Sequence, residues 1–183
     1  FKYFNFFLES LTQSFTFFGV PLEASRLNIV LPVGISFYTF QTMSYSIDVF
    51  RGTIKPTKDM VTFLGYVSFF PQLVAGPIER ASRLLPQFEN KRTFNFDNAK
   101  AGLYQLIYGL FKKIVIADSC AIYVDEIFAH HQDQSSLVLL LGIFYFSIQI
   151  YADFSGYSDI ALGTAKLFGF ELITNFKMPN FSR

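Results

Sequence analysis

Long stretches without a charged side chain alternate with short polar segments along this chain of 183 residues. A helix needs about 20 apolar residues to cross the hydrocarbon core of a bilayer. Stretches of about that length are found at residues 27–47, 60–78 and 134–152. A charge at the middle of such a span costs about 2.5 to 3.5 kcal/mol on insertion scales, so uninterrupted spans are selected by a membrane. The pattern therefore predicts transmembrane helices.

The stretch 60–78 differs from the others because its second half contains Pro71 and the pair Gly76-Pro77. Proline removes a backbone donor and clashes with the preceding turn of a helix. We therefore expect a broken or re-entrant helix. Non-helical backbone at membrane depth is tolerated only where it is buried in protein or lines a wet cavity, which makes this segment a candidate pocket wall.

Further apolar segments lie at 1–18, 101–117, 137–152 and 156–170. The loop 79–100 carries five Lys and Arg residues, whereas 118–133 carries four Asp and Glu residues and no Lys or Arg. Because cytoplasmic loops are enriched in Lys and Arg, we expect the first loop inside and the second outside. The helix 101–117 then runs outward, and its Lys112 and Lys113 must snorkel or face protein.

Composition supports a membrane protein: 51% of the residues are hydrophobic and 16% are charged, against about 25% charged in soluble proteins. The alternative, a soluble domain with a large core, is disfavoured because the residues without charge are concentrated in long stretches.

The net charge is +1 and the Lys and Arg residues are dispersed along the chain, which argues against nucleic acid as a partner. The single Cys120 has no companion for a disulfide or a zinc site, so we expect no metal and no bound cofactor.

The predicted fold class is all-α, a partial polytopic transmembrane helical bundle with a broken or re-entrant helix. Neither linkers nor repeats divide the chain, so residues 1–183 form a single partial domain. The chain opens at Phe1 without an initiator Met and stops at Arg183. We expect that it is truncated at both ends.

Polar groups inside membrane helices need a partner or a wet cavity and are functional candidates by default. Gln41, Tyr45 and Asp48 are spaced i, i+4 and i+7, which places them on one helical face. A catalytic or tunnel role and a hydrogen-bonded stripe between two helices explain this spacing equally well.

A second polar cluster occupies residues 149–159. Asp153 and Asp159 lie on different faces of a continuous helix, but a break at Gly156 would bring them together or let one of them cap a helix. His130 and His131 sit in a polar, acidic loop, and a solvated role is favoured for them. Ser155 lacks the leading Gly of a nucleophile elbow.

Four motifs then carry a resemblance, in order along the chain: residues 41–52 (QTMSYSIDVFRG), 69–80 (FFPQLVAGPIER), 109–118 (GLFKKIVIAD) and 151–159 (YADFSGYSD). From about residue 31 to residue 183 the chain resembles the membrane-bound O-acyltransferase family, and within it the bacterial alginate O-acetyltransferases. The resemblance implies a multi-pass enzyme of the bacterial inner (cytoplasmic) membrane, whose helices surround a tunnel in the lipid bilayer.

In such an enzyme an acyl thioester on the cytoplasmic side supplies an acyl group, in this branch acetyl. The acceptor is a hydroxyl of a cell-surface or exported polysaccharide such as alginate, reached through a periplasmic or extracytoplasmic partner protein. The family's catalytic His follows a Trp just downstream of a segment resembling residues 175–183. This chain contains no Trp, so the expected His lies beyond Arg183 and the fragment by itself is expected to be inactive.

Carried over position by position, the resemblance implies tunnel or framework residues, none of which is assigned as nucleophile or base: Gln41, Tyr45, Asp48, Gln72, Gly76, Pro77, Asp153 and Tyr157. Two alternatives stay open. A secondary transporter shares broken helices and polar groups at the midplane. A non-catalytic scaffold of the same fold would keep the framework motifs, because fold does not imply function.

Overall fold

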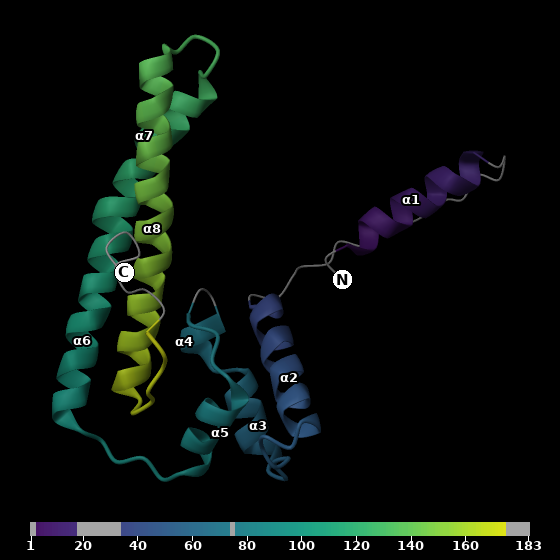
Figure 1. The fold of residues 1–183 in the computed structure, drawn as a ribbon, viewed down its shortest axis with the longest axis vertical. Coiled ribbons are helices and arrows are strands. Elements are labelled where there is room, and N and C mark those ends of the chain that lie inside the picture. Colours follow the sequence, from purple (N-terminus) through teal and green to yellow (C-terminus); the bar gives the residue numbers. More distant parts are fainter. Residues whose placement is uncertain (1–2, 18–33, 74–75, 175–183) are drawn as a thin grey trace. The chain divides into compact units, whose positions relative to one another are not determined.

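The computed structural model describes residues 3–17, 34–73 and 76–174, and every regular element within these ranges is helical (Figure 1). The all-α prediction is therefore confirmed for the described residues. The chain divides into two compact units, Phe1–Ile35 and Ser36–Arg183. The first unit contains α1 (Phe4–Phe17), whose Ser and Thr hydroxyls donate to carbonyls one turn earlier, as Ser10 does to Phe6 at 2.8 Å.

The second unit begins with α2 (Ile35–Phe50), which covers the described part of the predicted span 27–47; residues 27–33 lie outside the described ranges. The loop after α2 leads to α3 (Met60–Val67). Asp59 caps α3 by accepting the Thr62 hydroxyl at 2.6 Å and the Val61 N–H at 3.0 Å. These bonds to the charged carboxylate lower the pKa of Asp59.

The predicted interruption of 60–78 is present. After α3 the chain forms only the single turn α4 (Phe70–Leu73), and residues 76–80 are not helical before α5 (Ala81–Glu89) begins. Gly76 permits this turn, because a Cβ at that position would lie 2.4 Å from the Cα of Gln72.

From α6 (Phe96–Phe111) the chain runs without a break through the π-helical stretch η1 (Lys112–Ala117) into α7 (Asp118–Ala129). The prediction of a loop over 118–133 was therefore wrong for residues 118–129. Their acidic side chains lie on exposed faces and Val124 is buried, so a helix accommodates both without burying charge. From the sequence, the charged residue Asp118 marks the end of the preceding apolar segment, but the helix continues past it.

The helix α8 (Ser136–Leu167) has 32 residues and continues through Gly156. The expected division into segments 137–152 and 156–170 was wrong. The reason lies in packing: the backbone of Gly109 in α6 lies directly against Gly156, so this glycine permits close helix contact and α8 continues through it without a bend. At 1.5 Å per residue α8 is about 48 Å long, more than the roughly 30 Å of a bilayer core. Within the described ranges it is the one helix that is long and apolar enough to cross a membrane, and Met60–Leu73 is a shorter apolar stretch.

Glycines bring α6 and α8 into backbone contact. A Cβ on Gly163 would lie 2.5 Å from the Gly102 carbonyl oxygen, and a Cβ on Gly109 would lie 2.6 Å from the Gly156 carbonyl oxygen. Small residues at such crossings are typical of membrane helices, where close packing replaces the hydrophobic effect. The apolar core of this unit lies between α3, α5 and the end of α8, with Tyr66, Leu84 and Phe170 among its members.

Candidate functional site

A chain of polar side chains joins α6 and η1 to α8. The Lys112 ammonium donates to the Asp159 carboxylate and to the Ser155 hydroxyl, each at 2.7 Å. Gln105 donates to the other oxygen of Asp159 at 3.0 Å and accepts a hydrogen bond from Lys166 at 2.8 Å. Lys112 therefore faces protein, one of the two outcomes that the sequence allowed, and its charge is balanced inside the helix pair.

Lys113 forms a second group beside the first. Its ammonium lies 2.7 Å from Asp153 and 2.6 Å from Asp118, and 5.5 Å from the centre of the Tyr157 ring. The contact with Asp153 is an ion pair by distance, but it lacks the angles of a hydrogen bond. The structure thus brings together Asp153 and Tyr157, both of which the family motifs indicated. It does not pair Asp153 with Asp159, because α8 is unbroken and each carboxylate binds its own lysine.

On α2, Gln41 is buried, Tyr45 and Asp48 are half-buried, and the first two of these residues contact α3. The Tyr66 hydroxyl donates to the backbone carbonyl of Gln41 at 3.2 Å, and the centre of the Tyr45 ring lies 4.9 Å from that of Phe63. The Tyr45 hydroxyl also accepts the N–H of Thr57 at 3.0 Å, which ties the following loop to the helix. Asp48 is half-buried, and one of its carboxylate oxygens is enclosed without a hydrogen bond to any of the described residues.

Two buried amides stand out among the predicted tunnel residues. The side chains of Gln41 and Gln72 are 2% and 1% exposed, and neither amide oxygen nor amide nitrogen has a hydrogen-bond partner in the described part of the chain. A buried polar group without a partner costs about 1 to 3 kcal/mol. Buried polar groups that protein does not satisfy are the positions where water or a ligand is expected to bind.

Gly76 and Pro77 are buried, as expected of framework residues, and they lead to a residue that the sequence reasoning missed. The Glu79 side chain is 1% exposed, and one of its oxygens accepts the N–H of Ile173. Burial raises the pKa of Glu79 above its usual range, while the Ile173 N–H and the charge of Arg83 act in the opposite direction. The signal was available, because Glu79 belongs to the same motif as Gly76 and Pro77.

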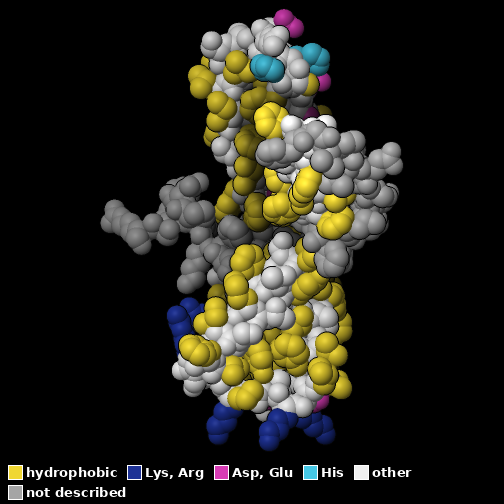
Figure 2. Space-filling model, turned by 90° about the vertical axis from the view of Figure 1, so that its right-hand side faces the viewer, with side chains coloured by type: hydrophobic (Ala, Val, Ile, Leu, Met, Phe, Trp, Pro, Cys, Tyr) yellow, Lys and Arg dark blue, Asp and Glu magenta, His cyan; other side chains and the backbone are white. Residues whose placement is uncertain are grey.

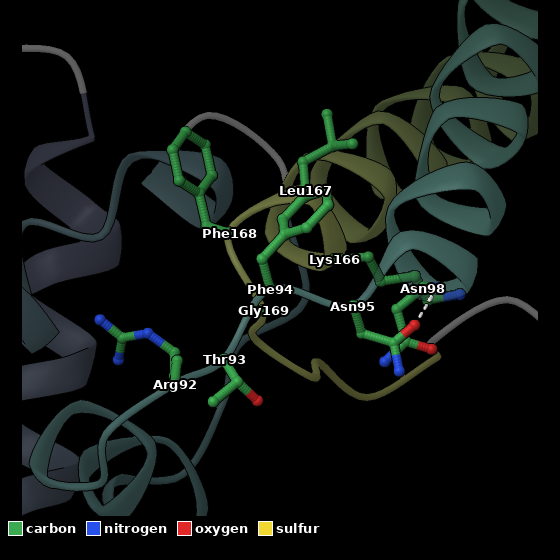
Figure 3. Close-up of a pocket in the computed structure, with 9 residues that line it drawn as sticks. All are labelled: Arg92, Thr93, Phe94, Asn95, Asn98, Lys166, Leu167, Phe168 and Gly169. Atoms are coloured by element: carbon green, nitrogen blue, oxygen red, sulfur yellow. Dashed lines mark hydrogen bonds between the residues drawn. The ribbon is translucent and has the colours of Figure 1, made fainter.

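A cleft of about 210 Å³ opens near the start of α6 (Figure 3). It is lined by Arg92, Asn95, Asn98 and Lys166 among others. The Arg92 guanidinium points away from Asn95 (Figure 3). It donates to the backbone carbonyl of Gln87 at 2.6 Å and lies 4.1 Å from the centre of the Phe170 ring. The Arg92 guanidinium therefore interacts with Gln87 and the Phe170 ring and does not face the cleft.

Lys and Arg side chains gather at one end of the second unit, and the histidines at the other (Figure 2). His130 and His131 are exposed at the end of α7, where each Nδ1 lies within hydrogen-bonding distance of a backbone carbonyl. This position agrees with the solvated role favoured for them. Nowhere in the described ranges do three or more His, Cys, Asp or Glu side chains gather as a metal site would require.

The sequence profile of the membrane-bound O-acyltransferase family matches residues 51–183. The chain is 42% identical over its whole length to the probable alginate O-acetylase AlgI of Pseudomonas putida, of which it covers 37%. It is 34% identical over 98% of its length to the peptidoglycan O-acetyltransferase of Helicobacter pylori, of which it covers 38%. It is 25% identical over 85% of its length to the teichoic acid D-alanyltransferase of Bacillus subtilis, of which it covers 40%.

The chain thus spans little more than a third of the length of these relatives. The family match nevertheless extends over well more than half of the chain and includes the interrupted segment and the α6–α8 pair, that is, most of the structure described above. The chain belongs to the membrane-bound O-acyltransferase family.

Proposed function

We propose that this chain is part of a multi-pass enzyme of the bacterial inner membrane that transfers an acyl group, in first place acetyl, to a hydroxyl of a cell-surface or exported polysaccharide such as alginate. The observation that carries the proposal is the match of the whole chain to relatives named for O-acetylation. Each relative reported above is named as an acyl- or alanyl-transferring enzyme, which favours this function over a secondary transporter.

The proposed reaction moves an acyl group from sulfur to oxygen. The acceptor hydroxyl oxygen bonds to the thioester carbonyl carbon, the carbon–sulfur bond breaks, and the hydroxyl proton ends on the thiol that leaves. A His base takes this proton during attack, and nearby donors stabilise the developing oxyanion. The resemblance assigns that base to the family's His downstream of residues 175–183, so none of the residues described here is proposed as the base.

The described residues are proposed to form part of the tunnel wall and its frame. Gln41 and Gln72 offer buried amides whose donors and acceptors have no partner among the described residues and can bind a polar ligand. Gly76 and Pro77 shape the non-helical backbone beside Gln72, and such backbone is tolerated at membrane depth when it lines a cavity. Tyr45, Asp153 and Tyr157 are proposed as framework, since their observed contacts join helices to one another or to loops. Asp48 is proposed with them because its backbone carbonyl accepts the N–H of Thr53 in the following loop at 2.9 Å.

The orientation is proposed from charge. The loop between α5 and α6 and the ends next to it carry Lys and Arg, whereas the end of α7 carries Asp and Glu and the α7–α8 turn carries Asp133 and the histidines (Figure 2). Cytoplasmic ends are enriched in Lys and Arg. The acyl thioester donor would then arrive at the α5–α6 side, and the polysaccharide, with its extracytoplasmic partner protein, at the α7–α8 side.

The test is an acyl-transfer assay on membranes that contain the intact protein. Radiolabelled acetyl-coenzyme A serves as the donor probe and deacetylated alginate as the acceptor probe, and base-labile label on the polymer is the readout. We expect labelled ester that disappears when the family's catalytic His is replaced by Ala. Ester that persists in this variant would contradict the mechanism, and correctly inserted protein that forms none with acetyl, alanyl or longer thioesters would favour a non-catalytic scaffold.

A further inference from the structure

The segment that follows α8 is tied to α5 by two side chains. Gln87 makes a reciprocal pair with Glu171: its amide oxygen accepts the Glu171 N–H at 2.8 Å, and its amide nitrogen donates to the Glu171 carbonyl at 3.0 Å. Glu79, just before α5, accepts the N–H of Ile173. Residues 171 and 173 are two apart, so their N–H groups lie on the same edge of an extended chain. Gln87 and Glu79 therefore bind this edge as a neighbouring strand would.

One face of the same segment is held by packing. Phe170 and Leu172 are 4% and 8% exposed. The Phe170 ring lies 4.6 Å from the rings of both Phe69 and Phe88. Alternation of buried side chains with bound N–H groups fixes both the direction and the register of residues 170–173, because a slip by one residue would exchange the two sets.

Nothing about α8 itself requires this arrangement. Gly169, at φ +75°, ends the helix, and the Phe170 N–H bonds back to Ala165 at 2.9 Å. After a helix end of this kind the following chain can leave in many different directions. The chain instead places a carboxylate with 1% exposure at Glu79, although burial disfavours the charged form of that group. Burying the Glu79 carboxylate costs desolvation energy, and its bond to the Ile173 N–H is not needed to end α8. We therefore expect this bond to have a function of its own.

We propose that Glu79 and Gln87 are positioning residues of the transfer reaction: by holding the backbone of residues 171–173 they set the path along which the chain leaves α8 toward the catalytic segment. This inference rests on the proposed function, which assigns the catalytic His downstream of residues 175–183. An error of about 1 Å in the placement of a reacting group can cost about a hundredfold in rate. Fixing the register of the chain shortly before that His would protect its placement.

The experiment uses the intact protein in detergent or nanodiscs, with acetyl-coenzyme A and deacetylated alginate as probes. Gln87→Ala removes both bonds to Glu171 from a half-buried position and leaves the core unchanged. Glu79→Gln keeps an acceptor oxygen for the Ile173 N–H, whereas Glu79→Ala removes it. Gln132→Ala, in the exposed α7–α8 turn, is the matched control. Each variant is measured by kcat, by KM for the donor, and by hydrogen–deuterium exchange of peptides covering 170–174.

We expect Gln87→Ala and Glu79→Ala to speed exchange at 170–174 and to lower kcat by about tenfold or more, with KM for the donor within about twofold. Glu79→Gln should restore both exchange protection and kcat, and Gln132→Ala should change neither. Faster exchange with unchanged kcat in Gln87→Ala would overturn the proposal. So would a loss of kcat in Glu79→Gln with exchange protection intact, because that result would give the carboxylate a chemical role.

Failure of the proposed function gives a different result. In that case the unsubstituted protein itself transfers no acetyl group, whatever the exchange data show. An active unsubstituted protein with equally active Gln87→Ala and Glu79→Ala variants would leave the acyltransferase assignment in place and remove only the positioning role.

Discussion

The close contact between α6 and α8 gives the sharpest stability prediction, the replacement of Gly163 by Ala. The added Cβ would lie 2.5 Å from the Gly102 carbonyl oxygen and 2.6 Å from the Leu106 amide nitrogen. Both are backbone atoms of a helix, so neither can rotate away. The helices themselves would have to separate.

The size of the effect follows from these distances. A carbon atom and a carbonyl oxygen in contact are normally about 3.3 to 3.6 Å apart, so the helices must move by roughly 0.8 to 1.1 Å. A gap of 0.5 to 1 Å forfeits about a quarter to a half of the dispersion energy of each atom pair along the interface. Overpacking of this kind typically costs about 1 to 3 kcal/mol, and we expect Gly163→Ala at the upper end.

The assay is thermal unfolding of the intact protein, followed by fluorescence-detected size-exclusion chromatography. The added methyl group also gains about 1 kcal/mol of helix propensity, which leaves a net loss of about 1 to 2 kcal/mol and, for a helical unit of this size, a fall in Tm of about 2 to 8 °C. Gly142→Ala is the comparison: it lies on the same helix α8, but its Cβ would meet a side-chain methyl, the Cγ2 of Ile127 at 2.9 Å, instead of backbone atoms. Both changes gain the same helix propensity, about 1 kcal/mol. Equal Tm values for the two variants would refute the backbone-contact reasoning.

Three further substitutions test the site in the intact protein. Lys112→Met should lower folded yield, measured by size-exclusion chromatography, because it leaves the Asp159 carboxylate without a cation; Asp159→Asn in addition should recover part of the loss. Asp48→Ala should lower either folded yield or acetyl transfer, and no change in both would remove it from the framework. His130→Ala combined with His131→Ala should leave the transfer rate unchanged, and a lost rate at normal yield would show that the pair takes part.

The sequence predicted those features that depend on local chemistry. Proline and glycine within 60–78 indicated an interrupted helix, and the structure breaks there after Val67. The i, i+4, i+7 spacing on α2 indicated a shared face, and Gln41 and Tyr45 do contact the α3 side through their backbone carbonyl and ring. Backbone rules and helical periodicity act within one segment, so a single sequence suffices to apply them.

The predictions that were wrong concern features decided by another segment. Gly156 was expected to break a helix, but its lack of a Cβ instead allows the Gly109 carbonyl oxygen to approach within 2.9 Å of the Cβ position. Asp118 was expected to end a helix, but it pairs with Lys113 five residues earlier, a spacing that the π-helical turn of η1 brings together. A glycine or a charged residue does not by itself show whether a helix ends or continues, because that depends on the residue packed against it.

The glycine contacts and the ion pairs of the α6–α8 interface depend on each other. The Cβ position of Gly156 lies 3.3 Å from the Lys112 Cβ and 3.2 Å from the Lys113 amide nitrogen, so the backbone of α8 passes directly beside both lysines. At this separation the Lys112 ammonium lies 2.7 Å from the Asp159 carboxylate. A charge that loses its partner inside a membrane becomes expensive, so separation of the helices would cost electrostatic as well as dispersion energy. The small residues set the distance between the helices, and at that distance the half-buried charges of Lys112 and Asp159 neutralise each other.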